Sequence, residues 1–132
     1  MARLVALIIS IAVFTGASRA GAAESTTYTC ALGKAFECTS YYGCQEWSAI
    51  EMSLPRFVRV DLNAKTIVSL DKEIPRDPTK IASVEKLDEM IVFNGIEQRS
   101  WSMTIGEDSG ELALTAVGNG EVFSVFGTCI SP

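Results

Sequence analysis

The chain has 132 residues, of which 48% are hydrophobic, and its 11 Lys and Arg against 16 Asp and Glu give a formal net charge of −5. Nucleic acids and anionic membranes bind proteins through clusters of Lys and Arg. The net negative charge of this chain argues against both as partners. The sequence contains no histidine. This excludes Ser-His-Asp and Cys-His sites and removes the commonest zinc ligand. We therefore expect no enzymatic activity, no cofactor and no metal.

Residues 1–22 have the pattern of a cleaved export signal. An arginine precedes the apolar run Leu4–Phe14, and the small residues Ala20-Gly21-Ala22 fit an Ala-x-Ala cleavage rule. The apolar run is shorter than the roughly 20 residues that a membrane-spanning helix needs. The sequence thus predicts a signal peptide at 1–22 and a single domain at 23–132, located in the periplasm or secreted.

Cleavage of this signal would change the charge of the mature protein. Arg3 and Arg19 would be lost, leaving nine basic against sixteen acidic residues and a net charge of −7. Net charge steers association, so a basic protein is the partner that this composition suits best. We expect the mature domain to be a monomer without membrane attachment.

The rest of the chain alternates apolar and polar residues in the way that is typical of half-buried β-strands. After two N-terminal strands at 26–31 and 48–54, the alternation predicts strands at 56–62, 66–70, 80–86, 90–94, 100–105, 111–117 and 121–129. Turn residues separate them at short intervals, as at 106–110 and 118–120. The expected fold is all-β, a small antiparallel barrel of about eight strands in a meander.

Two segments leave room for another interpretation. Residues 71–79 mix acidic and basic side chains with two prolines, and we expect them to form a solvated loop. Ile81, Val84 and Leu87 lie at helical spacing, so a short helix within 79–90 is the alternative to a strand there.

Four cysteines, Cys30, Cys38, Cys44 and Cys129, predict two disulfides in an exported domain. Their spacing lacks the C-x2-C of zinc and redox sites. Cys30 and Cys129 lie in the first and last strands, which are neighbours in a closed antiparallel barrel. Adjacency therefore favours Cys30–Cys129 with Cys38–Cys44. The pairing Cys30–Cys38 with Cys44–Cys129 stays open, because it encloses loops of similar length.

The candidate binding residues lie on or beside constrained turns. Tyr41 and Tyr42 stand inside the short cystine loop, where tethered aromatic side chains offer contact area at a low entropy cost. Trp47 follows this loop and is a candidate for the mouth of a cavity. Glu107 and Asp108 form an acidic turn. Barrel capping, core packing and turn chemistry are the structural alternatives for these three groups.

Several short motifs carry a resemblance to a known group of proteins. They are Tyr28-Thr29-Cys30, Glu37-Cys38, Gly43-Cys44, Trp101-x-Met103-x-Ile105, Ser109-Gly110-x-Leu112 and Gly127-Thr128-Cys129. With these motifs the chain resembles small exported bacterial β proteins with four cysteines and no assigned activity. Its expected architecture is also similar to that of the periplasmic inhibitors of c-type lysozyme. The resemblance implies export and an all-β fold, and it implies no activity.

Two binding roles follow from these features. The leading hypothesis is a non-enzymatic binding or inhibitor-type module that contacts a protein through Tyr41, Tyr42 and the turn at Glu107. The alternative is a carrier that holds a small apolar ligand inside the barrel, with Met90, Met103 and Phe126 as candidate lining residues. Eight strands enclose just enough room for side chains or for one small ligand.

Overall fold

The computed structural model describes residues 26–132, which form ten antiparallel strands and no helix. The strands are β1 (Thr27–Thr39), β2 (Gly43–Ser48), β3 (Phe57–Asp61), β4 (Thr66–Ser69), β5 (Thr79–Lys80), β6 (Ser83–Leu87), β7 (Met90–Ile96), β8 (Ser100–Gly106), β9 (Glu111–Gly118) and β10 (Glu121–Ile130). The all-β prediction is therefore confirmed. The predicted signal peptide at 1–22 lies outside the described residues.

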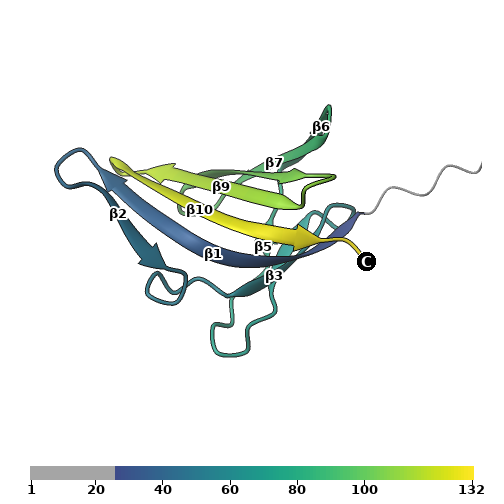
Figure 1. The fold of residues 1–132 in the computed structure, drawn as a ribbon, viewed down its shortest axis with the longest axis horizontal. Coiled ribbons are helices and arrows are strands. Elements are labelled where there is room, and N and C mark those ends of the chain that lie inside the picture. Colours follow the sequence, from purple (N-terminus) through teal and green to yellow (C-terminus); the bar gives the residue numbers. More distant parts are fainter. Residues whose placement is uncertain (1–25) are drawn as a thin grey trace, which may run out of the picture.

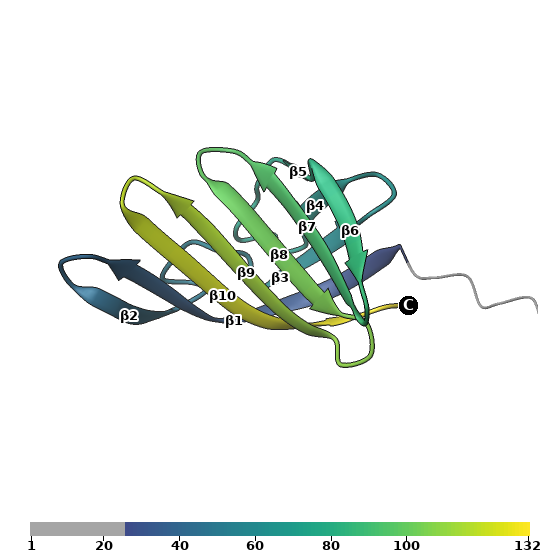
Figure 2. The ribbon, with the colours of Figure 1, turned by 90° about the horizontal axis from the view of Figure 1, so that it is seen from above.

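The strands form one curled sheet in the order β5-β4-β3-β1-β10-β9-β8-β7-β6, with β2 attached to β1. Figures 1 and 2 show this half-barrel: β6 to β10 make one wall, and β3 to β5 make the wall that faces it. The chain itself links the two edges of the curl. The amide of Ile81 donates to the carbonyl oxygen of Lys65 in the β3–β4 turn, and the amide of Ala82 donates to that of Asn94 in β7.

Strand β1 changes partner halfway along its length. Its first half, from Thr27 to Ala31, pairs with β3, and its second half, from Lys34 to Thr39, pairs with β2. Strand β10 pairs with the opposite side of β1 along both halves, and the register of this pairing shifts between Leu32 and Ala35. Such a bulge bends a strand and increases its twist. The β1–β2 hairpin forms an arm at one end of the sheet (Figure 1), in which β1 stays paired with β10 as far as Thr39.

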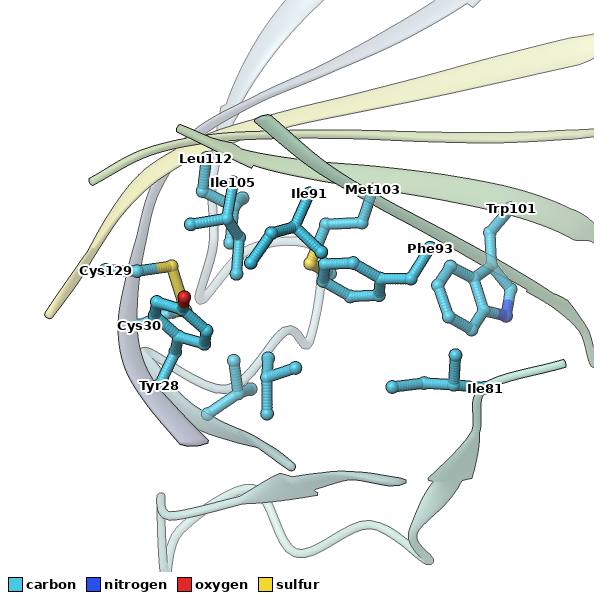
Figure 3. Close-up of a cluster of buried hydrophobic side chains, with 12 residues drawn as sticks. Tyr28, Cys30, Ile81, Ile91, Phe93, Trp101, Met103, Ile105, Leu112 and Cys129 are labelled. Atoms are coloured by element: carbon cyan, nitrogen blue, oxygen red, sulfur yellow. A yellow bond between two sulfur atoms is a disulfide. The ribbon is translucent and has the colours of Figure 1, made fainter. Parts of the chain in front are cut away.

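Inward-facing side chains fill one end of the half-barrel. Alternation in β8 buries Trp101, Met103 and Ile105 and leaves Ser100 and Ser102 exposed, as the sequence predicts. Figure 3 shows these side chains packed between the two walls. The buried cluster comprises Tyr28, Cys30, Val58, Val60, Ile81, Ile91, Phe93, Trp101, Met103, Ile105, Leu112 and Cys129.

Both disulfides join residues that face each other across a strand pair. Cys30 lies opposite Cys129 in the β1–β10 ladder, and Cys38 lies opposite Cys44 in the β1–β2 hairpin. The predicted pairing is confirmed, and the alternative pairing is excluded. Cys30 and Cys129 are buried in the core, which places the first bond at the centre of the fold.

The strand predicted at 48–54 is wrong, because the chain turns directly after β2. The carboxylate of Glu51 accepts hydrogen bonds from the backbone amide and the hydroxyl of Ser48, both at 2.8 Å. Both bonds lower the pKa of Glu51, and the bond from the amide has the larger effect. Local side-chain bonds of this kind compete with the ladder of a sheet, so the apolar residues of 48–54 do not continue the strand.

The segment predicted as one strand at 80–86 consists of two strands, β5 and β6. Residues 81 and 82 separate them, because the chain passes there from one edge of the curl to the other. The helical alternative for 79–90 is wrong. Val84 and Leu87 belong to β6, which pairs with β7 in a hairpin whose turn contains Asp88 at φ 49°.

Asp71 departs from the expectation of a solvated loop, because it is 7% exposed and bound to Arg56. The guanidinium donates from Nε to one carboxylate oxygen (2.9 Å) and from Nη2 to the other (3.3 Å). The backbone amides of Arg56 and Glu73 donate to the same carboxylate. These bonds, chiefly that from the Arg56 side chain, lower the pKa of Asp71 from 3.8 to about 2. The pair fixes the start of the loop against β3.

This lowered pKa predicts acid sensitivity. A carboxyl whose pKa is depressed on folding stabilises the native state above its unfolded pKa of 3.8. That contribution is lost as the pH falls through the folded value of about 2. We expect Asp71→Asn to melt below the wild type at pH 7, with a difference that shrinks between pH 4 and pH 2 in thermal unfolding. The exposed Asp77→Asn is the matched control, and a difference that stays constant with pH would contradict the assignment.

Candidate functional site

The half-barrel is filled at one end and hollow at the other. The hollow end holds a cavity of about 620 Å³, within the roughly 300–1,000 Å³ range of ligand sites. One wall consists of Trp101, Met103, Leu114, Ala116, Phe123 and Val125 from β8, β9 and β10. The facing wall includes Leu32, Leu54, Pro55, Val58, Ile67 and Ile74. Both walls are therefore apolar.

Trp101 fits this wall because the residue opposite it has no side chain. Gly95 pairs with Trp101 across β7 and β8. A Cβ atom at Gly95 would lie 2.5 Å from Cζ2 of the indole and 2.7 Å from the carbonyl oxygen of Lys80. The indole also meets Phe93 edge to face, with 6.3 Å between ring centroids. Glycine at 95 thus allows a large aromatic ring to lie flat where the core ends.

Arg99 lies at the rim of the cavity and is held in place by three contacts. Its Nη2 donates to the Glu121 carboxylate at 3.1 Å, and its Cζ lies 4.6 Å from the centroid of the Phe123 ring. Its stem crosses Gly118, where an added Cβ would lie 3.1 Å from the arginine Cγ. Arg76, Asp77, Glu97 and Gln98 complete the polar rim.

Two buried donors at this cavity have no acceptor among the residues that the structure describes. They are Nε1 of Trp101 and Nε of Arg99, and both residues line the cavity. Nε1 of Trp47 is a third buried donor without an acceptor, but Trp47 does not line the cavity. Within residues 26–132 no three His, Cys, Asp or Glu side chains gather in a way that could hold a metal ion. The cavity therefore offers chiefly apolar surface, with polar side chains at its rim.

The structure places the two predicted tyrosines at the tip of the β1–β2 arm. Tyr41 is 92% exposed and Tyr42 is 80% exposed. The Cys38–Cys44 bond closes the hairpin below them, and the amide of Tyr42 donates to the Thr39 hydroxyl at 3.1 Å. Neither tyrosine caps the barrel, so both rings are open to solvent on a constrained turn.

The other predicted surface residues do not join the tyrosines. Glu107 and Asp108 lie in the β8–β9 turn, beside the end of β10, whereas the tyrosine arm begins beside its start. Glu107 forms an ion pair with Lys86 at 3.2 Å, and Asp108 is exposed. Trp47 lies in β2, where it pairs with Ala35 of β1, and it does not line the cavity. The five residues thus lie in three places: the tip of the arm, the far end of β2 and the β8–β9 turn.

Of the three candidate lining residues, only Met103 lines the cavity. Met90 and Phe126 lie on the outer face, 37% and 49% exposed, so their interior placement is wrong. The period of two explains the error, because Ile91 in β7 and Val125 in β10 point inward and their neighbours must point out. Phe126 instead meets Phe36 on the outside, with 6.0 Å between ring centroids.

Sequence reasoning missed Arg99 and Phe123, which shape the rim. The sequence could have predicted the cavity wall from the alternation in β9, which places Leu114 and Ala116 on the same inner face as Leu112. The small Ala116 also pairs with the large Trp101. A large residue beside a small one leaves space that neighbours must fill. No such signal existed for Arg99, because its position depends on a pairing with Glu121, which is 22 residues away.

The two disulfides indicate an oxidising environment outside the cytoplasm. Residues 26–132 contain no helix of the length and hydrophobicity that crossing a membrane requires. Comparison of the chain with protein-family models, with curated proteins and with solved structures finds no match in any of the three. The case for function therefore depends on the geometry of the cavity and of the tyrosine arm.

Proposed function

We propose that this chain is a non-enzymatic exported binding protein that holds a small apolar ligand in the end cavity. The observation that carries the proposal is the cavity itself, about 620 Å³ of apolar-walled space at the hollow end of the half-barrel. The export pattern at 1–22 and the two disulfides support a periplasmic or secreted location for this role.

Filling the cavity tests this proposal. Ala116→Phe adds a ring inside the cavity, so a neutral apolar probe such as N-phenyl-1-naphthylamine should bind at least about tenfold more weakly because the new side chain occupies its space. Fluorescence titration measures the affinity. Ala113→Phe is the matched control, because Ala113 lies on the same strand and faces solvent. Wild-type protein that takes up no probe, or two variants that bind it equally well, would refute the cavity as the site.

A second candidate function is the binding of a protein partner through the tyrosine arm. The observation that favours it is the exposure of Tyr41 and Tyr42, at 92% and 80%, on a turn that a disulfide closes. Buried aromatic anchors dominate the energy of many interfaces, and a constrained turn loses little entropy on binding. The acidic composition suits a basic partner.

The arm can be tested without disturbing the fold. Tyr41→Ser/Tyr42→Ser should leave the melting temperature unchanged, because both rings are solvent-exposed. Immobilised wild type should retain a partner from periplasmic extract at low salt, and the double variant should lose it. Exposed Phe57→Ser, on β3 and away from the arm, serves as the control. Retention of the same partner by the double variant would rule out the arm as its contact.

A further inference from the structure

We infer that the Cys38–Cys44 bond is a redox-sensitive closure of the β1–β2 arm, which a dithiol reduces in the folded protein while the Cys30–Cys129 bond stays intact. Reduction then releases the first residues of β2 together with the turn that carries Tyr41 and Tyr42, and the barrel keeps its fold. This inference goes beyond the proposed function, because it concerns the chemistry of the arm and holds whatever the arm or the cavity binds.

The two disulfides differ in how easily a thiol reaches them. Cys30 and Cys129 belong to the buried cluster of the barrel, where Figure 3 shows their bond beside the ring of Tyr28. Cys44 is exposed and Cys38 is half-buried. Disulfide exchange needs a thiolate to approach one sulfur atom, so its rate depends on access. Reduction of the buried bond therefore has to wait for the sheet to open, which costs a large part of the free energy of unfolding.

The alternation along β1 places the arm disulfide on the outer face of the sheet. Phe36 meets Phe126 on that outer face, and Cys38 lies two residues further along β1, so it shares the face of Phe36. Cys38 pairs with Val122 of β10 on one side and with Cys44 on the other. The arm disulfide thus lies on the side of the sheet that faces solvent, away from the cavity and the core.

Strand β2 is the part of the arm that this bond holds in place. Strand β1 keeps β10 as a second neighbour as far as Thr39, whereas β2 pairs with β1 alone. Every residue of β2 except the half-buried Trp47 is exposed. Besides the backbone ladder, Lys34 and Glu46 form an ion pair across the two strands at 3.4 Å, but both side chains are exposed and such pairs contribute little. The start of β2 therefore has low local stability once the bond is reduced.

The far end of β2 limits the movement. Trp47 pairs with Ala35, which is fully buried, and Ala49 directly after the strand is 5% exposed. The hydrogen bonds between Ser48 and Glu51 hold the turn that follows. Reduction should therefore free the chain from the tyrosine turn to about Glu46 and leave Trp47 and the barrel in place.

The reduction is a two-electron exchange with a dithiol as the reductant. One thiolate of the dithiol attacks the sulfur of Cys44, the bond to Cys38 breaks, and Cys38 leaves as a thiolate that takes up a proton. The second thiol of the reagent then attacks the mixed disulfide, releases Cys44 as a thiol and closes the reagent into a cyclic disulfide. The dithiol thus loses the two electrons and two protons that the two cysteines gain.

The first experiment follows both bonds in the same molecules. The oxidised mature protein is incubated with dithiothreitol without denaturant, samples are alkylated with iodoacetamide over time, and peptide mass spectrometry counts the modified cysteines. We expect Cys38 and Cys44 to become alkylated at least about tenfold faster than Cys30 and Cys129, because the buried bond reacts only in opened molecules. In urea all four should react rapidly, which is the internal control. Equal rates for the two bonds without denaturant, or an arm bond that reacts only in urea, would overturn the inference.

The second experiment uses the tyrosines as reporters of the released segment. Chymotrypsin cleaves after aromatic residues in segments that open, so the selectively reduced and alkylated protein should be cut after Tyr41 or Tyr42 at least about tenfold faster than the oxidised protein. Cys38→Ala/Cys44→Ala should be cut like the reduced protein, which separates loss of the bond from the effect of alkylation. Tyr41→Ser/Tyr42→Ser is the matched control, because it removes both cleavage sites. Unchanged cleavage after reduction would overturn the release of the arm, and equally fast cleavage within β6 to β10 would show that the barrel opens as well and would also overturn the inference.

Discussion

Replacement of both Cys30 and Cys129 by alanine is expected to lower the free energy of unfolding by about 4–5 kcal/mol. The bond joins residues 99 positions apart, and closing a loop of about 100 residues removes roughly 4.7 kcal/mol of chain entropy from the unfolded state. Both residues are also buried, at 0% and 6% exposure, so truncation leaves unfilled space in the core. Urea denaturation at neutral pH measures the change.

The second disulfide supplies the control. Cys38→Ala/Cys44→Ala opens a loop with a separation of only 6 residues, for which the same relation gives about 2.4 kcal/mol. These residues lie on the projecting arm, so the barrel should stay intact. Equal losses for the two double variants, or a larger loss for the arm, would show that the Cys30–Cys129 bond does not dominate the stability of the barrel.

Phe93→Ala is expected to cost about 3–5 kcal/mol, the usual range for deleting a fully buried phenylalanine. Phe93 is 0% exposed, among the largest side chains that are fully buried, and its ring supports the indole of Trp101. Thermal and urea unfolding would both record the loss. Phe93→Leu retains most of the volume and keeps the measurement possible if the alanine variant does not fold.

Phe57→Ala is the matched control for this substitution, because Phe57 is 49% exposed on β3. We expect it to cost about 1 kcal/mol or less. Similar costs at positions 57 and 93 would mean that the packing around Phe93 is loose and that the cavity extends further into the core than the structure indicates.

The sequence predicts the C-terminal strands and the disulfides well, because both depend on local or topological rules, but it misses β2 and the second half of β1. Alternation identifies β8, β9 and β10 nearly residue by residue, and neighbouring first and last strands explain the bond between Cys30 and Cys129. The expected interior placement of Met90 and Phe126 is wrong because neither hydrophobicity nor size tells which face of a strand a residue occupies. Only the alternation along the whole strand shows which residues face inward.

The features that sequence reasoning could not reach depend on distant partners. Asp71 looks like any loop carboxylate until Arg56, which is 15 residues away, binds it. The change of partner along β1 occurs beside a register shift that contains Gly33. A single glycine can mark a bulge, but it does not specify which strands pair on either side of it. The cavity is the space that the inner faces of the strands and the loops around them leave unfilled, so it depends on residues far apart in the sequence.

The central position of β10 also constrains the order in which the molecule can be assembled. Strand β10 is the last of the ten to be synthesised, yet it pairs with β1 and β9 in the middle of the sheet. Without β10, strands β1 to β4 lose the strand that joins them to the wall formed by β6 to β9 and keep only the covalent link through the segment near Ile81. We therefore expect the mature chain truncated before residue 121 to stay sensitive to proteases in vitro, whereas the chain that includes β10 and the Cys30–Cys129 bond is resistant.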